Sequence, residues 1–217
     1  MNTHLHLLEA LTTYYRASGS SLARQRLVEL ILIQSNTVVR KDVGACTDRY
    51  TQDWTPISTR VSYGHDIENV WLLMDACEAV GQSNRPLLDF YRSLYGYSYK
   101  YGYDTTHGGF YDSGEFLQPA DRRSKIWWVQ AEALVSALYL YRMTDDARYA
   151  AVFAQTFDFV NKYMADWTFG EWHGRTSPEG VANPANKAHA WKCGYHNGRA
   201  MIECLEILKA FKASQTE

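Results

Sequence analysis

Residues 62–73 read SYGHDIENVWLL, in which a polar and aromatic opening that contains His65 leads into an apolar run. Related openings occur in SKIWWVQAEA (124–133), KCGYHNGRAM (192–201) and MNTHLHLLEA (1–10). Measured between His6, His65, Trp128 and His196, they recur at intervals of 59, 63 and 68 residues. This regular spacing indicates a repeat of helical hairpins wound into a ring or solenoid. If the polar helix starts gather at one end of a ring of inner helices, their side chains face a common pocket.

Apolar residues recur every three or four positions, as in Leu5, Leu8 and Leu11, which predicts amphipathic helices. We expect seven of them, near residues 2–17, 20–38, 65–81, 85–101, 123–143, 146–165 and 192–213. Strand signals are scarce, and the long polar segments are 39–64, 102–122 and 166–190. The sequence therefore predicts an all-α protein with a single domain over residues 1–217.

Composition narrows the class of protein. The chain has 217 residues, of which 46% are hydrophobic, which is typical of a globular unit with a sizeable core. Lys and Arg number 22 against 24 Asp and Glu with no basic stripe, so we expect no nucleic-acid partner. No stretch is long and apolar enough to span a bilayer, and the four cysteines form no C-x-x-C pair. These features predict a cytoplasmic protein without a membrane partner.

Histidines near the helix starts are the candidates for chemistry. His65 and Glu68 are three residues apart and Asn2 and His6 are four apart, so each pair shares one face of a helix. His4 and His6 would point to different sides, which argues against a metal site. A single histidine at a helix start most often caps the helix or meets solvent. Because His6, His65 and His196 occupy corresponding positions in the repeat, a shared pocket is favoured instead.

Two histidines on opposite sides of a carbon can remove and return a proton, since imidazole titrates near neutral pH. In an aldose the ring opens first, and C2 beside the aldehyde then loses its proton to give an enediolate. Asn2 and His6 could donate hydrogen bonds to its oxygens. Glu68 could orient His65, and Trp128 and Trp191 could stack on sugar rings. Other polar residues within the helices are interpreted as a stabilising network: Glu132, Asn197 and Arg199.

Other chemistries fit less well. No G-x-G-x-x-G or P-loop motif occurs, so we expect no nucleotide cofactor, and no cofactor of any other kind. A glycosidase with two carboxylates is a weaker hypothesis, because no placement singles out a pair. The carboxylates that could be considered for it are Asp66, Glu68, Asp104 and Asp112.

MNTHLHLLEALTTYYR, SYGHDIENVWLL, KIWWVQAEAL and KCGYHNGRAMIE together resemble the N-acylglucosamine 2-epimerase superfamily, and its cellobiose 2-epimerases most. The resemblance implies an (α/α)6 barrel, here an incomplete barrel of about seven helices, with its site at the mouth of the inner helices. It implies that His65 and His196 are the acid/base pair and that His6 assists ring opening or contacts the C1 oxygen. It also assigns sugar binding or orientation to four further positions: Asn2, Glu68, Trp128 and Trp191.

The departures from the family pattern carry expectations of their own. Family members are nearly twice as long, so the chain corresponds to the C-terminal half of the barrel, and Gly194 stands where relatives commonly have proline. We therefore expect one of three outcomes. The chain is an inactive truncated or split product, it pairs with a separate N-terminal half, or it associates with a second copy of itself. The predicted reaction is epimerisation at C2 of the reducing-end glucose of cellobiose or a related β-1,4-linked disaccharide. The alternatives are an aldose–ketose isomerase and a non-catalytic fragment.

Overall fold

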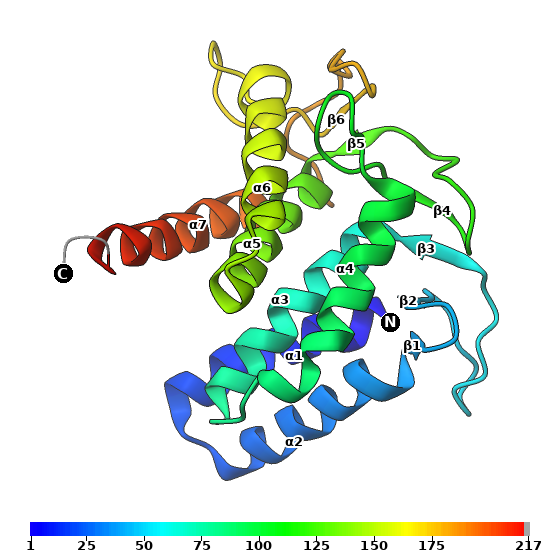
Figure 1. Cartoon of the computed structure of the whole chain (residues 1–217), viewed down its shortest axis with the longest axis vertical. Helices are drawn as coiled ribbons and strands as arrows, with labels where there is room; N and C mark the ends of the chain where they lie inside the picture. The colour runs from blue at the N-terminus through cyan, green and yellow to red at the C-terminus, as the bar shows by residue number, and fades with distance from the viewer. Residues whose placement is uncertain (215–217) are drawn as a thin grey trace. The chain divides into compact units, whose positions relative to one another are not determined.

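The computed structural model describes residues 1–214, and it confirms the prediction of an all-α protein with seven helices (Figure 1). The helices are α1 (Asn2–Ser18), α2 (Ser21–Leu32), α3 (Tyr63–Ala79), α4 (Leu88–Gly102), α5 (Trp127–Thr144), α6 (Ala147–Phe159) and α7 (Tyr195–Ser214). The chain forms two compact units. The first unit comprises residues 1–101 and 113–121, and the second comprises 102–112 and the chain from 122 onward.

A tight turn joins α1 to α2 in the first unit. Gly19 has a φ of 63°, a left-handed conformation that glycine adopts without a Cβ clash, and its N–H donates to the Tyr15 oxygen at 2.9 Å. The Ser20 hydroxyl then caps α2 by accepting a hydrogen bond from the Ala23 N–H at 3.3 Å. The two helices pack on each other, and α1 also packs against α3. This hairpin is the repeating element that the sequence predicts.

Two helix boundaries in the first unit differ from the predictions. The predicted helix 20–38 is wrong at its C-terminal end, because α2 stops at Leu32 and the chain continues as a π-helical turn, η1 (Ile33–Thr37). There the Ser35 hydroxyl donates to the Ile31 oxygen at 2.7 Å, a local bond that competes with regular helix pairing. The predicted helix 85–101 opens instead with a 3-10 turn, η2 (Arg85–Leu87), which has a proline in its first turn.

Short β-strands, which the sequence pattern does not predict, lie in or next to the long polar segments. The described residues contain three antiparallel two-stranded sheets: β1 (Val39–Arg40) with β2 (Ala45–Cys46), β3 (Arg60–Ser62) with β4 (Ser113–Glu115), and β5 (Lys125–Ile126) with β6 (Arg175–Thr176). Two of the strands, β3 and β5, run directly into α3 and α5. These sheets therefore fix where the two helices begin.

In the second unit, α5 packs against both α6 and α7. Most of α5 is buried, in keeping with its mainly apolar sequence. The predicted start of helix 123–143 is wrong, because Lys125 and Ile126 pair with β6 before α5 begins. The predicted helix 146–165 ends as a π-helical turn, η3 (Val160–Met164), and the predicted helix 192–213 begins only at Tyr195. No helix within residues 1–214 has both the length and the apolar character needed to cross a membrane.

Candidate functional site

The first unit holds four of the candidate residues. His65 and Glu68 lie in the first turns of α3, where the His65 side chain is 20% exposed and Glu68 is fully buried. Asn2 and His6 lie at the start of α1, the helix that packs against α3. Nδ1 of His6 is 3.2 Å from a carboxylate oxygen of Glu9, one turn further along α1. The joint action of Asn2 with His6, and of His65 with Glu68, on one ligand stays a prediction.

Asp66, the neighbour of His65, holds strand β2 against the start of α3. Both carboxylate oxygens of Asp66 accept the Cys46 N–H, each at 3.2 Å, and the side chain is almost completely buried. Burial raises the pKa of the Asp66 carboxyl well above its ordinary value. The segment that follows β2 brings the Asp48 Oδ1 atom to 3.8 Å from the His65 Nδ1 atom. Asp66 therefore fixes β2, and Asp48 follows the end of that strand by two residues.

The second unit holds Trp128, His196 and Trp191. The His196 Nδ1 atom is 2.6 Å from the Oε1 atom of Glu132, which is fully buried on α5. Arg199, one turn after His196 on α7, donates to the same oxygen at 2.8 Å. The Trp128 ring, one turn before Glu132, lies 5.6 Å from the His196 ring, centroid to centroid. Packing of α7 on α5 thus places the imidazole beside both a buried carboxylate and an aromatic ring.

This arrangement has a direct chemical consequence. When Nδ1–H of His196 donates to Glu132, the other ring nitrogen, Nε2, is left to accept or deliver a proton. The carboxylate fixes the tautomer and the orientation of the ring, and it stabilises the imidazolium that forms when Nε2 takes a proton. The guanidinium of Arg199 compensates the buried charge of Glu132. This geometry can therefore support proton transfer at Nε2.

Trp191 lies away from these contacts, on the segment before α7, and is 88% exposed. Its predicted part in sugar binding stays a prediction. Next to it, Lys192 is almost completely buried, and its ammonium group donates to the Glu171 carboxylate at 2.8 Å. The same Glu171 oxygen accepts the Asn197 side-chain N–H at 2.9 Å. Asn197 is adjacent to His196, so this network fastens the start of α7.

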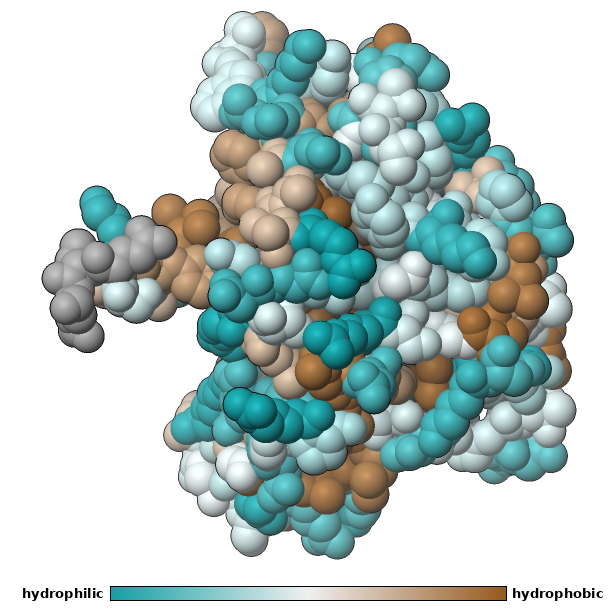
Figure 2. Space-filling model, in the orientation of Figure 1, coloured by the Kyte–Doolittle hydropathy of each residue, from teal (hydrophilic) through white to brown (hydrophobic). Residues whose placement is uncertain are grey.

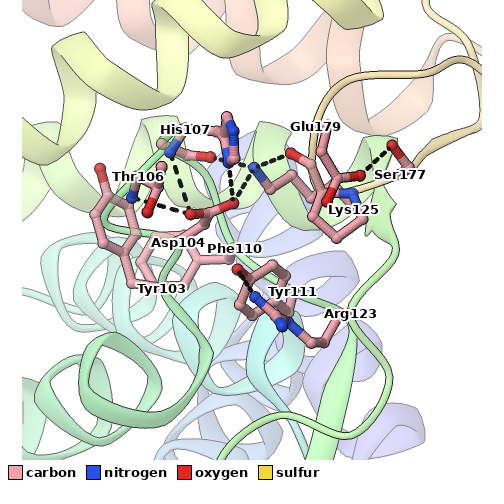
Figure 3. Close-up of polar contacts among 12 residues, drawn as sticks. Tyr103, Asp104, Thr106, His107, Phe110, Tyr111, Arg123, Lys125, Ser177 and Glu179 are labelled. Carbon is pink, nitrogen blue, oxygen red and sulfur yellow. Dashed lines mark hydrogen bonds and ion pairs between the residues drawn. The ribbon is translucent and has the colours of Figure 1, made fainter.

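A second buried lysine precedes α5 in the second unit (Figure 3). The ammonium group of Lys125 lies 2.9 Å from the Asp104 carboxylate and donates to the oxygens of Gly108 at 2.6 Å and Pro178 at 3.0 Å. Burial would raise the pKa of Asp104, but the hydrogen bond and charge of Lys125 outweigh it and lower that pKa to about 2. Asp104 was a carboxylate of the glycosidase hypothesis, and its contacts instead give it a structural role.

The same lysine–aspartate arrangement occurs again 62 residues further along the chain. Lys187 lies 2.5 Å from the Asp166 carboxylate and donates to the Gly170 oxygen at 2.7 Å. Asp104 and Asp166 each accept two N–H groups of their own loop with one carboxylate oxygen. In both copies, a lysine that precedes one helix (α5 or α7) holds the loop that follows the helix before it (α4 or α6). We call these two lysine–aspartate arrangements clamps. Because they occur at corresponding places, the repeat includes the loops as well as the helix openings.

A family model described as N-acylglucosamine 2-epimerase matches residues 1–200, which is most of the chain. The chain belongs to this family. Membership confirms the resemblance carried by the four sequence motifs. Membership also agrees with the repeat of helical hairpins that the sequence predicts.

Several known proteins are similar to this chain in sequence or in fold. A cellobiose 2-epimerase from Bacteroides fragilis is 31% identical over 94% of this chain and 53% of its own length. The solved structure of a cellobiose 2-epimerase from Bacillus thermoamylovorans has a TM-score of 0.88 at 31% identity, covering 95% of this chain and 53% of that chain. A D-mannose isomerase from Marinomonas mediterranea is 25% identical over 96% of this chain and 55% of its length.

The solved cellobiose 2-epimerases have the (α/α)6 barrel fold, so the predicted fold type is confirmed. The chain spans about half the length of the curated relatives that it matches. The sequence predicts a stabilising network for Glu132 and Arg199, but it does not pair them with His196. The spacing of Glu132 could have drawn attention to it. Glu132 follows Trp128 by four residues and so shares its helix face, much as Glu68 follows His65 by three.

Proposed function

We propose that this chain carries the two acid/base histidines of a sugar 2-epimerase. The reaction is cofactor-independent epimerisation at C2 of the reducing-end glucose of cellobiose or a related β-1,4-linked disaccharide. The observation that carries the proposal is the 2.6 Å contact between His196 Nδ1 and the buried Glu132 carboxylate. Membership of the N-acylglucosamine 2-epimerase family supports the class of reaction.

In the proposed mechanism the sugar ring opens first, so that an aldehyde stands beside C2. One histidine, His65 or His196, removes the C2 proton, and the electron pair of the C–H bond forms the enediolate. The other histidine returns a proton to the opposite face, which inverts C2 and regenerates the aldehyde. His6 and Asn2 donate hydrogen bonds to the developing oxyanions, since negative charge in a dry pocket needs preorganised donors.

The remaining candidate residues have supporting roles in this mechanism. Glu68, buried one turn after His65, orients that imidazole. Trp128, whose ring lies beside His196, and the exposed Trp191 stack on the sugar rings. No metal ion and no cofactor takes part in these steps.

We propose further that residues 1–217 act as one half of an (α/α)6 barrel and associate with an N-terminal half. One side of α7 supports this, because Ile202, Leu205 and Leu208 are exposed although α7 buries Cys204 and Ile207 on its other side. Figure 2 shows hydrophobic side chains at the surface of this helix. Burying such a face against another helix removes apolar area from water. The chain alone is then inactive or weakly active.

A cytoplasmic location also fits, because Cys46, Cys77, Cys193 and Cys204 are all free thiols.

An aldose–ketose isomerase is the second candidate function, which the similarity to a D-mannose isomerase favours. In that reaction the proton removed from C2 returns to C1, which gives a ketose instead of the C2 epimer. The reaction product distinguishes the two.

The test is to incubate the purified chain with cellobiose in D2O and follow deuterium at C2, epimer and ketose by NMR. The chain is assayed alone and with the N-terminal half of a relative supplied separately. We expect exchange and epimer formation in at least one arm, and loss of both in His65→Ala and His196→Ala. Exchange that survives both substitutions would contradict the two-histidine mechanism, and ketose as the main product would favour the isomerase.

A further inference from the structure

A cavity of about 260 Å³ lies in the first unit, between the turn that joins β1 to β2 and the first half of α4. Residues of η1 and η2 complete its walls. Since a water molecule takes up about 30 Å³ in the liquid, the cavity suits a ligand of roughly nine non-hydrogen atoms. None of the residues proposed for the sugar reaction lines it, so the cavity is separate from that site.

The turn between β1 and β2 approaches α4 closely. A Cβ atom at Gly44 would lie 2.8 Å from the Ser93 hydroxyl oxygen, so a side chain at this position would displace that hydroxyl. Gly44 has a φ of 83°, which glycine adopts without a Cβ clash, and its N–H donates to the Arg40 oxygen at 2.7 Å. The turn is therefore a fixed wall of the cavity.

One part of the lining is apolar. Val39 and Leu94 are buried there, and two further lining side chains, Leu87 and Phe90, are partly buried. The Phe90 ring meets the Tyr91 ring edge-on at 5.8 Å, which restricts its orientation. This surface suits the apolar body of a ligand, because burying that body removes apolar area from water.

The remaining lining is polar, and it includes the Lys41 ammonium group and the Ser93 hydroxyl. The amide group of Asn36, in the π-helical turn η1, is oriented by its own hydrogen bonds. Its Nδ2 atom donates to the Leu32 oxygen at 3.3 Å and to the Ser35 hydroxyl at 2.9 Å. The amide oxygen accepts a hydrogen bond from Lys41 at 3.1 Å. The turn η1 thus holds the ammonium group at the cavity.

The positive charge of Lys41 is not balanced by a carboxylate. Its hydrogen-bond partner is a neutral amide, and within residues 1–214 it forms no ion pair. The carboxylate of Asp42, next to it in the sequence, is held by Arg40 through hydrogen bonds of 3.0 and 2.6 Å. An ammonium group has three donors, of which the Asn36 oxygen uses one. A ligand with a negative charge can accept from the others.

We propose that this cavity binds a small aromatic or branched-chain carboxylic acid as its anion. The carboxylate pairs with the Lys41 ammonium group and accepts a hydrogen bond from the Ser93 hydroxyl, while the apolar body lies against Leu87 and Phe90. A single carboxylate matches a single cation, whereas a phosphate dianion would keep an unpaired charge beside the apolar wall. The inference does not depend on the proposed function, because no residue of that mechanism takes part.

The test uses benzoate as the probe and benzamide as an uncharged molecule of nearly the same shape. Each is titrated into the isotope-labelled full chain and followed by two-dimensional NMR. Benzoate should shift the amide signals of Lys41, Gly44 and Ser93 saturably, and benzamide should bind about threefold more weakly or worse. Lys41→Met should weaken benzoate by a similar factor and leave benzamide unchanged, because methionine keeps the apolar stem without the charge.

Phe90→Ala is the second variant and should weaken both probes, since it removes part of the apolar wall. The matched control is Lys100→Met, because Lys100 is another exposed lysine of the first unit, on α4, and does not line the cavity. It should bind benzoate as the unchanged chain does, and circular dichroism verifies that each variant is folded. Absence of saturable shifts at the cavity, or equal benzoate affinity in Lys41→Met and the unchanged chain, would overturn the proposal.

Discussion

Nδ1 of His196 and Oε1 of Glu132 lie 2.6 Å apart, although the two residues are 64 positions apart in the sequence. The contact joins the first turn of α7 to the second turn of α5, where Glu132 is buried. It gives the imidazole a fixed partner on one nitrogen and leaves the other nitrogen for chemistry.

Glu132→Gln should reduce C2 exchange by about 10²-fold or more, in whichever assay arm the unchanged chain is active. The amide carries no charge to stabilise the imidazolium and can present the wrong hydrogen-bonding group to Nδ1. Initial rates of deuterium incorporation measure the effect. Glu203→Gln, on the same helix as His196, is the control and should leave the rate nearly unchanged. A Glu132→Gln rate within threefold of the unchanged chain would contradict the assigned role.

Glu132→Ala should lower the free energy of unfolding by about 3 kcal/mol, because it leaves the mostly buried Arg199 charge without this carboxylate. Urea unfolding followed by circular dichroism measures the loss. The double variant Glu132→Ala/Arg199→Met should recover part of it, since no uncompensated charge then remains. Additive losses in the double variant would show that the two side chains are energetically independent.

Lys125→Met should also cost about 3 kcal/mol, because it leaves the Asp104 carboxylate buried without its cation. The pKa of Asp104 is about 2 in the folded protein, below its ordinary value of 3.8. The stabilisation from this pair is therefore fully present above pH 3.8 and is lost as the pH falls through about 2. Lys187→Met is the matched control in the more exposed clamp and should cost less. Equal losses would contradict burial as the cause.

Gly108→Ala should destabilise the protein more than Gly170→Ala. Both glycines have left-handed backbones, with φ of 78° and 76°. An alanine at either position pays about 1 kcal/mol for that conformation. At Gly108 the added Cβ would also lie 2.5 Å from the Gln155 backbone oxygen, whereas at Gly170 nothing lies within 4 Å. Thermal unfolding compares the two, and equal shifts in Tm would argue against the close approach at Gly108.

Asp66→Asn should change how stability depends on pH. Burial raises the pKa of Asp66 in the folded protein, so the folded chain binds this proton more tightly than the unfolded chain. Its contribution to stability therefore falls as the pH rises above the ordinary value of 3.8. Asparagine keeps an acceptor for the Cys46 N–H but does not ionise. Unfolding free energies from pH 4 to pH 8 should fall less steeply in the variant, and an unchanged slope would contradict this account.

The helices and their repeat could be predicted from the amino-acid pattern alone. Apolar spacing identified seven helices because burial of one face imposes a period of three to four residues. The motifs around His65 and His196 identified the family because they combine unusual residues in a fixed order. Helix ends were less predictable, since the π-turn after Leu32 and the strand pairing of Lys125 depend on local competition for backbone hydrogen bonds.

Contacts between side chains that are distant in the sequence could be seen only in the folded chain. His196 with Glu132, Asp48 with His65, and Lys125 with Asp104 are separated in sequence by segments whose path no local pattern specifies. The close approach of Gly44 to Ser93 likewise depends on how the turn between β1 and β2 meets α4. The physical reason is that periodicity reports only which face of a helix avoids water. Partner choice depends on how loops return the chain and on which charges burial forces to pair.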